Sequence, residues 1–347
     1  MEKTTINDIA RLTGLSKGTV DRVLHNRGEV SRKSYEKVMA VIRELGYEPN
    51  LYASLLAKGK ERTVAVLLPS PEPGSYWELA ESGVRKAEAL MKPMAVVARV
   101  FTYDQYSADS FRSTWAALLE SEPDGVVIAP MFQYETQVFT QVLRQRGIPY
   151  VFVDTKPEES GYLAFFGIPA YKSGYLCADM LTGGESVKEV LIVRVMRDKQ
   201  RQSDPTVHRR AGFLDYMLEH NPACTIRSLF IDPSDPTATD DALDAFFKEF
   251  PDVRHIAVFN SRIHLIVPYL ERHPAAARRV VGFDNLGANL AALRRGTVTM
   301  LIAQHPEEQL QQAIQALSER IVLQRLPDKT DNYMHMDILM RYNIEDY

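Results

Sequence analysis

The stretch from Thr5 to Leu24 carries two cationic side chains, Lys17 and Arg22, on what its spacing predicts to be a short helix. Such side chains can donate hydrogen bonds to guanine O6 and N7 in the DNA major groove. A first helix precedes it, and Gly14 supplies the backbone freedom for a tight turn between the two. The pattern predicts a helix-turn-helix, which places its second helix in the major groove. Helix pairs with a glycine in the turn are common, so the pattern alone also fits a purely structural role.

Apolar residues predict how these helices pack. The first helix shows its apolar face at Ile6, Ile9, Ala10 and Leu12, and the second at Thr19, Val20 and Val23. Ser16 and Ser31 stand where helix N-caps belong, and the third helix is expected to run from Ser31 to Leu45. The segment at 51–58 is too apolar for a monomer's linker and is better explained as a helix paired in a dimer.

The remainder of the chain alternates apolar, strand-like runs with helical patterns. The strand-like runs are 64–68, 95–101, 125–129, 150–153, 189–195, 228–231, 255–259, 280–283 and 299–303. Alternating βα units predict parallel, doubly wound sheets with helices on both faces. So many strands are more than one such sheet usually holds, so we expect two similar subdomains.

We therefore expect a small all-α helix-turn-helix domain followed by an α/β domain of two doubly wound subdomains. The expected boundaries are 1–48 for the DNA-binding domain, 49–61 for a hinge helix and linker, and 62–347 for an effector-binding domain. Its first subdomain is expected at about 62–166 and 298–326, and its second at about 167–297 and 327–347.

In open α/β sheets, ligands bind beyond the carboxyl ends of the strands. The loops after the predicted strands are therefore the expected ligand site. They are 69–77, 130–134, 154–155, 197–209, 260–261, 284–285 and 304–305. Asp154 and Asp284 could instead cap the helices that follow them, and Arg209 could form a surface ion pair.

Composition is that of an ordinary soluble globular chain with length for two or three domains. The amino terminus lacks the apolar run of a signal peptide, and no stretch approaches the ~20 apolar residues of a membrane span. Cys177 and Cys224 have no metal-binding spacing and are expected to be small core residues. We expect a cytoplasmic protein with no membrane contact, no cofactor and no metal.

Charge is unevenly distributed along the chain. Residues 1–60 contain 11 Lys/Arg and 7 Asp/Glu, a net charge of +4, whereas the remainder contains 30 and 38, a net charge of −8. A basic head on an acidic body suits a head that meets DNA phosphates, although random scatter explains it as well.

Enzyme motifs are missing from the sequence. It contains no HExxH, GxSxG or GxxxxGK[ST] pattern and no Rossmann glycine pattern. His208 near Asp204 is better explained as a surface pair than as catalytic machinery. Three hypotheses remain: a ligand-responsive DNA-binding regulator, a solute-binding module with weak DNA contact, and an enzyme on a binding-protein-like fold.

The head resembles the DNA-binding domain of the LacI/GalR family of bacterial transcription regulators. The resemblance lies in TINDIARLTGLSKGTVDRVL, in GYEPN at 46–50 and in the ASLLA segment that follows. The body resembles the family's effector domain, which has a periplasmic-sugar-binding-protein fold, chiefly through VVGFD at 280–284 and VFN at 258–260. The resemblance implies a homodimer that binds a pseudo-palindromic operator, and a repressor that responds to a sugar-like molecule. With no leucine heptad tail before Tyr347, we expect a dimer rather than a tetramer.

The resemblance also implies which residues meet DNA. Lys17 and Gly18 stand at the base-reading positions of the recognition helix, and Arg22 lies a turn later. The other implied DNA contacts are Thr5, Ser16, Thr19, Asp21, Asn26, Ser31, Ser54 and Leu56. Leu56 matches the leucine that the family wedges into the minor groove, where an apolar side chain can unstack a base step.

Two departures bear on affinity. Asp21 stands where the family usually has serine, so its carboxylate repels phosphate, pairs with Lys17, or accepts from cytosine N4. Ser54 stands where the family often has a longer polar residue, which is expected to weaken minor-groove contact.

For the effector, the resemblance implies polar groups on hydroxyls and aromatic faces on sugar rings. The implied contacts are Tyr76, Trp77, Phe132, Asp154, Arg209, Asn260, Asp284 and Gln304, with Tyr134 a further aromatic in the same loops. A ligand held between the subdomains would change their closure and, through it, operator affinity.

Overall fold

A computed structural model of the chain describes residues 6–24, 28, 30–45, 61–158, 161–195, 204–275 and 278–345. The chain divides into two compact units, residues 1–60 and 61–347, which are described separately below. Four of the residues expected to contact DNA, namely Thr5, Asn26, Ser54 and Leu56, lie outside the described residues, as does the expected hinge helix.

Three helices form the first unit: α1 (Ile6–Thr13), α2 (Lys17–Leu24) and α3 (Arg32–Leu45). Their shared core is made of Ile9, Val20, Val23 and Val38, which are almost completely buried. The predicted helix-turn-helix and the third helix are thus confirmed. Small aliphatic side chains at the right helical spacing are what brings three short helices around one core.

Local hydrogen bonds explain where these helices begin. The Ser16 hydroxyl accepts from the backbone N–H of Thr19 at 3.2 Å, and the Ser31 hydroxyl accepts from that of Ser34 at 3.3 Å. The expectation for Leu12 was wrong, because its side chain is 55% exposed and Thr13 is buried instead. On a 3.6-residue repeat, position 13 lies on the same face as Ile9, whereas position 12 turns away from the centre of that face.

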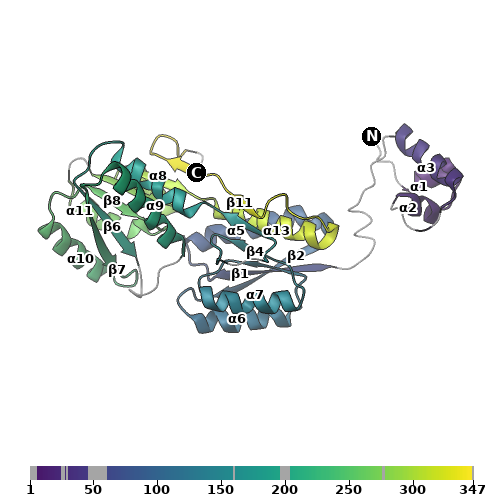
Figure 1. The fold of residues 1–347 in the computed structure, drawn as a ribbon, viewed down its shortest axis with the longest axis horizontal. Coiled ribbons are helices and arrows are strands. Elements are labelled where there is room, and N and C mark those ends of the chain that lie inside the picture. The colour runs from purple at the N-terminus through teal and green to yellow at the C-terminus, as the bar shows by residue number, and fades with distance from the viewer. Residues whose placement is uncertain are drawn as a thin grey trace. The chain divides into compact units, whose positions relative to one another are not determined.

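The second unit begins with a six-stranded parallel sheet in the order β11–β5–β4–β3–β1–β2 (Figure 1). Its strands are β1 (Arg62–Pro69), β2 (Val96–Tyr103), β3 (Gly125–Ile128), β4 (Tyr150–Val153), β5 (Ala164–Gly167) and β11 (Asp331–Tyr333). Around it lie α5 (Tyr76–Met91), α6 (Ala108–Glu120), α7 (Gln133–Gln145), α13 (Pro306–Leu323) and the short η1 (Lys92–Met94). We call this sheet and its helices the first lobe.

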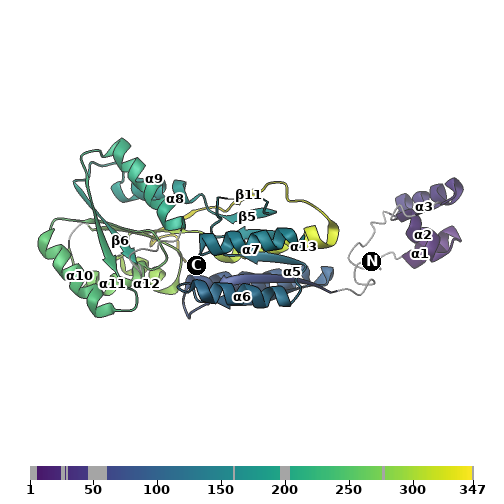
Figure 2. The same cartoon turned by 60° about the horizontal axis from the view of Figure 1, so that its bottom comes forward.

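Both faces of the first sheet are buried. Along β1, Val64, Val66 and Leu68 pack with α5 and α13, whereas Ala65 and Leu67 pack with α6 and α7. Alternate residues of a strand face opposite sides of a sheet, so a continuous apolar run is needed where helices cover both. The turned view shows α6 lying against the sheet on the side away from α13 (Figure 2).

The second lobe repeats this architecture with the order β12–β10–β9–β8–β6–β7, in which β12 alone is antiparallel. Its strands are β6 (Glu189–Val195), β7 (Thr225–Ile231), β8 (His255–Val258), β9 (Arg279–Phe283), β10 (Met300–Ala303) and β12 (Asp337–Leu339). Its helices are α8 (Ala170–Thr182), α9 (Asp204–His220), α10 (Pro236–Glu249), η2 (Ile263–Leu265), α11 (Val267–Arg272) and α12 (Gly287–Arg295). Helices α8 and α9 cover one face and α10, α11 and α12 the other. Cys177 is buried in this core, as its small apolar character predicts.

The sheets correct two expected subdomain limits. Residues 298–326 were expected in the first subdomain, but β10 pairs with β9 in the second sheet, and only α13 returns to the first lobe. Residues 327–347 were expected in the second, but β11 pairs with β5 in the first sheet. An apolar run predicts a buried strand without saying which of two similar sheets it joins, so crossings between lobes were misplaced. The short strands β5, β11 and β12 were also not predicted.

Candidate functional site

A cavity of about 620 Å³ lies at the carboxyl ends of strands from both lobes. Residues of both lobes line it, from the loops after β1, β2, β3 and β4 and after β6, β7, β8, β9 and β10. All eight residues expected at the ligand site are among them: Tyr76, Trp77, Phe132, Asp154, Arg209, Asn260, Asp284 and Gln304. Tyr134 is not, and its ring is 72% exposed. Of the expected loop 197–209, residues 197–203 lie outside the described residues, and Thr206 and Arg209 line the cavity.

The first lobe contributes a tyrosine–aspartate pair. The Tyr76 hydroxyl donates to Asp154 Oδ1 at 2.7 Å, and the Trp77 ring meets the Tyr76 ring edge-on with centroids 4.9 Å apart. Burial, reinforced by Asp154, raises the pKa of Tyr76 well above its usual value, so the phenol remains a donor. Burial also raises the pKa of Asp154, against the opposing effects of Arg209 and of the tyrosine hydrogen bond.

The second lobe contributes a buried arginine from α9. Arg209 is only 3% exposed, which excludes the surface ion pair considered as its alternative. Its Nη1 donates to the carbonyl of Phe259 at 2.8 Å and its Nη2 to Gln304 Oε1 at 2.6 Å. The guanidinium carbon lies 4.2 Å from the centre of the Phe283 ring. Hydrogen bonds and stacking together fix the plane of the guanidinium group at the cavity.

Asp284 follows β9 and is 1% exposed. Its Oδ1 accepts from Gln304 Nε2 at 2.8 Å. Burial raises the pKa of Asp284 to about 7, although Arg209 and the glutamine hydrogen bond act to lower it. The nearby α12 has Leu286 as its N-cap residue, so Asp284 does not cap that helix.

The two aspartates share an unusual backbone. Asp154 has φ of 64° and Asp284 φ of 70°, the left-handed region that non-glycine residues seldom adopt. Each directly follows a strand, one in each lobe. Residues held in this region cost about 1–3 kcal/mol and gather at binding sites, where the surrounding structure holds them. The matching geometry aims one carboxylate from each lobe at the same cavity.

Gln309 joins the two halves of the site and was not predicted. It is 1% exposed on α13, where its Oε1 accepts from the Asp154 backbone N–H at 3.0 Å. Its Nε2 donates to the Gln304 carbonyl at 2.8 Å. A glutamine in the second turn of a helix normally faces solvent, so no signal in the sequence marks it.

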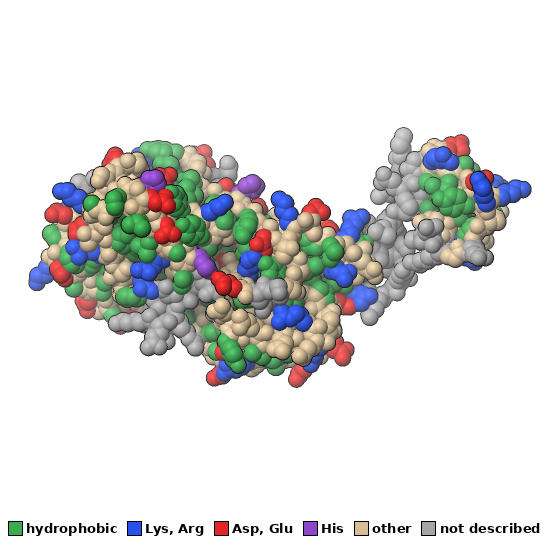
Figure 3. All heavy atoms as spheres, viewed as in Figure 1, with side chains coloured by type: hydrophobic (Ala, Val, Ile, Leu, Met, Phe, Trp, Pro, Cys, Tyr) green, Lys and Arg blue, Asp and Glu red, His purple; other side chains and the backbone are tan. Residues whose placement is uncertain are grey.

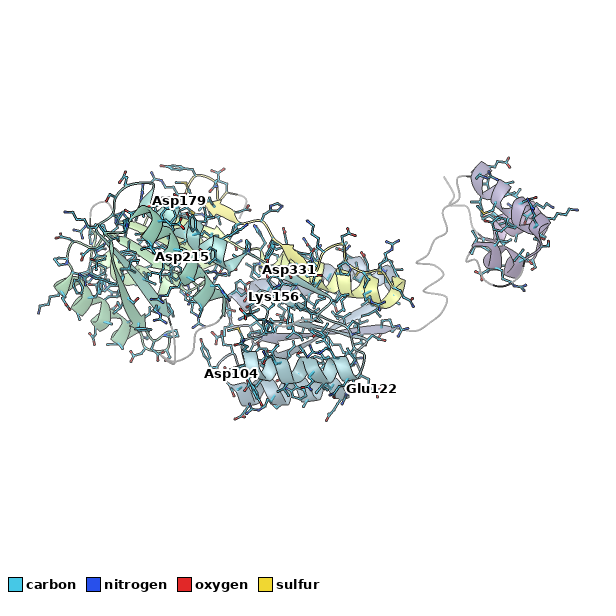
Figure 4. The ribbon with its side chains drawn as sticks, in the orientation of Figure 1. Asp104, Glu122, Lys156, Asp179, Asp215 and Asp331 are labelled. Atoms are coloured by element: carbon cyan, nitrogen blue, oxygen red, sulfur yellow. The ribbon has the colours of Figure 1, made fainter. Side chains whose placement is uncertain are left out.

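A lysine anchors the loop that carries Asp154. Lys156 Nζ donates to both carboxylate oxygens of Asp331 at 2.6 Å and to the Tyr162 hydroxyl at 2.7 Å. Figure 4 labels Lys156 and Asp331 next to each other in the first lobe. Because β11 is followed by the crossing to β12 in the second lobe, this ion pair ties a site loop to one of the connections between lobes.

The mouth of the cavity is lined by loops of both lobes. Asn260 Oδ1 accepts from the backbone N–H of Arg262 at 3.1 Å, which leaves the Asn260 amide nitrogen for other acceptors. The Arg262 guanidinium lies 5.7 Å from the centre of the Tyr106 ring in the first lobe. Phe132 packs against Phe111 with ring centroids 5.8 Å apart, so it serves the core as well as the cavity wall.

The head presents a polar face on α2. Lys17, Gly18 and Arg22 are exposed, whereas Val20 and Val23 on the same helix are buried. Ser16 and Ser31 are exposed and act as helix caps, and Thr19 and Asp21 are partly buried. The residues expected to read bases therefore share the face of α2 that the core leaves open.

Membrane-spanning helices and metal-binding clusters were sought among the described residues as signs of other functions. None of the helices in the described ranges is long and apolar enough to cross a membrane. The same ranges hold no cluster of three or more His, Cys, Asp or Glu side chains suited to a metal ion. On the face of the second unit seen in Figure 3, acidic and basic side chains are interspersed, so its acidic excess is not gathered there into one patch.

Comparison with known proteins decides the family. Residues 64–322 match the periplasmic binding protein domain, and residues 5–50 match the bacterial regulatory proteins of the lacI family. A protein assigned as a LacI transcriptional regulator from Bacteroides fragilis superposes with a TM-score of 0.78 at 36% identity, over 83% of this chain and 100% of that one. The chain belongs to the LacI family.

Curated relatives match over a smaller part of this chain. The transcriptional regulator DegA of Bacillus subtilis is 33% identical over 127 residues, 37% of this chain and 36% of DegA. The sucrose operon repressor of Pediococcus pentosaceus is 25% identical over 62% of this chain and 61% of its own length. The chain spans between 36% and 62% of the first curated relatives it matches.

Solute-binding proteins share the fold of the second unit. One from Agrobacterium vitis, solved with α-D-tagatopyranose, has a TM-score of 0.70 at 20% identity, over 82% of this chain and 97% of that one. At this identity the likeness concerns the fold alone. The expected fold class, a helix-turn-helix domain followed by a binding-protein-like domain of two lobes, is confirmed.

Proposed function

We propose that this LacI-family chain is a ligand-responsive DNA-binding regulator, a repressor that binds a pseudo-palindromic operator as a homodimer in the cytoplasm. One observation carries the proposal: a single chain joins a recognition helix with exposed Lys17 and Arg22 to a cavity that polar and aromatic residues of both lobes line. The name of the sucrose operon repressor among the relatives supports a sugar-like effector.

The side chains of α2 contact the operator bases directly in this proposal. Lys17 and Arg22 are exposed one turn apart and donate to guanine O6 and N7, while Gly18 lets the helix approach the bases closely. Asp21, partly buried on the same helix, is the residue that sets this chain apart, because a carboxylate excludes phosphate and selects a cytosine amine. Leu56 is proposed to wedge into the operator centre.

The effector acts through the closure of the lobes. The chain crosses between them after β5, after β10 and after β11, so a ligand that contacts Asp154 and Asp284 together favours one closure angle. If closure changes operator affinity by some factor, the operator must change ligand affinity by the same factor. The second candidate is a solute-binding sensor with weak DNA contact, which the carboxylate of Asp21 favours.

Selection of operator sequences from random duplex DNA at fixed salt, with and without a panel of sugars, tests the proposal. We expect an enriched palindrome with a flexible pyrimidine–purine step at its centre, and a sugar that shifts retention. Arg22→Ala should lower affinity by about 1–3 kcal/mol and relax specificity at one position of each half-site. Arg43→Ala, at an exposed site near the end of α3, is the matched control. No enriched sequence under any condition would favour the sensor instead.

The wedge is tested separately with Leu56→Ala. The substitution should weaken binding to the selected operator and reduce its bending, while binding to random DNA at the same salt persists through phosphate contacts. Unchanged operator affinity and unchanged bending would remove the wedge from the proposal without touching the recognition helix.

A further inference from the structure

The floor of the cavity brings together two carboxylates and one guanidinium group. Asp154 reaches it from the first lobe, and Asp284 and Arg209 from the second. Asp284 and Arg209 are 1% and 3% exposed, so their charges are largely removed from water. Buried charges are stable only when they are paired. On the described floor, one negative charge remains without a partner when both carboxylates are ionised.

Arg209 does not balance both carboxylates. It directs Nη1 to the Phe259 carbonyl and Nη2 to Gln304 Oε1, and its Nε has no hydrogen-bond partner among the described residues. Its charge lowers the pKa of both aspartates, yet burial outweighs it, and the pKa of Asp284 rises to about 7. Arg209 Nη1 and Nη2 each carry a second N–H, which can donate to a ligand oxygen, whereas the Nε–H is buried.

The other groups around Asp284 add no compensating charge. Glu307 of α13 is negative and raises the pKa of Asp284 further, as does Asp154. Burial lowers the pKa of His264, which lines the cavity, and so disfavours a positive charge there. Arg262 lies at the mouth, over the Tyr106 ring. The groups that face Asp284 from every neighbouring element therefore leave the floor acceptor-rich and negative.

We propose that the cavity binds a polyol that carries a protonated amine, an amino sugar in chemical class, with its ammonium group between Asp154 and Asp284. The inference rests on the proposed function and specifies its ligand. An ammonium group supplies the missing positive charge and up to three donors to carboxylate oxygens that the protein leaves open. Ligand hydroxyls accept from Arg209 and Asn260, and the face of Trp77 bounds the ring.

Other sugars fit this floor less well. A sugar acid or sugar phosphate adds a third negative charge beside the buried carboxylate of Asp284 and the partly buried one of Asp154. A neutral hexose leaves the floor unbalanced unless one carboxyl keeps its proton. The pH dependence separates the cases: affinity for an amino sugar rises from pH 5.5 towards pH 7 as Asp284 ionises and falls again at higher pH as the ligand amine loses its proton, whereas affinity for a neutral sugar is flat or falls throughout.

The experiment is calorimetric titration of the full chain at pH 7, where the ligand amine is still mostly protonated, with glucosamine, galactosamine and mannosamine. The N-acetyl derivatives and the parent hexoses serve as uncharged partners of the same ring shape, and glucuronate and galacturonate as anions. We expect one amino sugar to bind at least tenfold more tightly than its hexose and its N-acetyl derivative. Neither uronate is expected to bind.

Isosteric variants test whether the carboxylates cause the preference. Asp154→Asn should abolish the tenfold difference in affinity between the amino sugar and its hexose. The charge of Arg209 then balances the one remaining carboxylate, that of Asp284. Asp215 lies on α9 and is not among the residues that line the cavity, so Asp215→Asn should keep the tenfold difference in affinity. If the unsubstituted chain binds an amino sugar and its parent hexose with equal affinity, the proposal of an amine-bearing ligand is overturned, and the proposed sugar effector stands. Binding of no compound in the panel would overturn the proposed sugar effector as well. Melting curves confirm that each variant is folded.

Discussion

Asp284→Asn should stabilise the unliganded protein, and more so as the pH rises. The carboxyl is 1% exposed, and burial raises its pKa to about 7 from an ordinary 3.8. Between these two values the folded state holds a proton that the unfolded state has released. Stability therefore falls as the pH rises through this window, and the loss is complete above about pH 7.

The magnitude follows from the two pKa values. Each unit corresponds to about 1.4 kcal/mol, so ionising Asp284 in the folded state costs about 4 kcal/mol at pH 8. Asparagine keeps an oxygen to accept from Gln304 Nε2, which donates to the native carboxylate at 2.8 Å. The variant should match the parent near pH 4 and exceed it by up to about 4 kcal/mol at pH 8.

Urea unfolding followed by circular dichroism at pH 4.5, 6 and 8 measures this difference. Asp252→Asn is the matched control, because the Asp252 side chain is 94% exposed and its replacement should change stability by less than about 0.5 kcal/mol at every pH. If Asp284→Asn shifted stability equally at pH 4.5 and pH 8, the carboxyl would not be titrating in this range. The argument from its burial would then be refuted.

Two further predictions concern packing and the tyrosine pair. Gly174→Ala should destabilise the second lobe by about 1–3 kcal/mol in the same unfolding assay, since an added Cβ would lie 1.8 Å from the Arg209 carbonyl oxygen. Gly287→Ala, whose Cβ would meet nothing within 4 Å, should be neutral or slightly stabilising, and equal costs would contradict the reasoning. Tyr76→Phe removes a hydrogen bond that lowers the pKa of Asp154, so the carboxyl ¹³C titration should move to higher pH; a move to lower pH would refute the assignment.

The sequence predicted the head and the site because each leaves a local signature. Strands buried on both faces appear as apolar runs, and their ends mark the loops where a ligand site can form. Asp154, Asp284 and Gln304 could be located in this way without knowledge of how the two sheets meet. The crossings between lobes were misplaced because neither the apolar run of β10 nor the short, polar β11 shows in its residues which sheet it joins, and only the hydrogen bonding of the folded chain decides this.

Gln309 shows why the contacts that join the two lobes at the site could not be predicted from the sequence. It lies on α13 of the first lobe, yet it holds the Asp154 backbone through one amide atom and the Gln304 carbonyl through the other. Gln304 in turn positions Arg209 and Asp284 through its own side chain. Gln309 and Gln304 are both buried. A ligand that displaces Asp154 would therefore act on Arg209 and Asp284 of the second lobe through the hydrogen bonds of these two glutamines. Such coupling depends on atoms that meet only in the folded chain, so it has no sequence pattern, and it gives the two lobes a mechanical link that is already in place before any ligand binds.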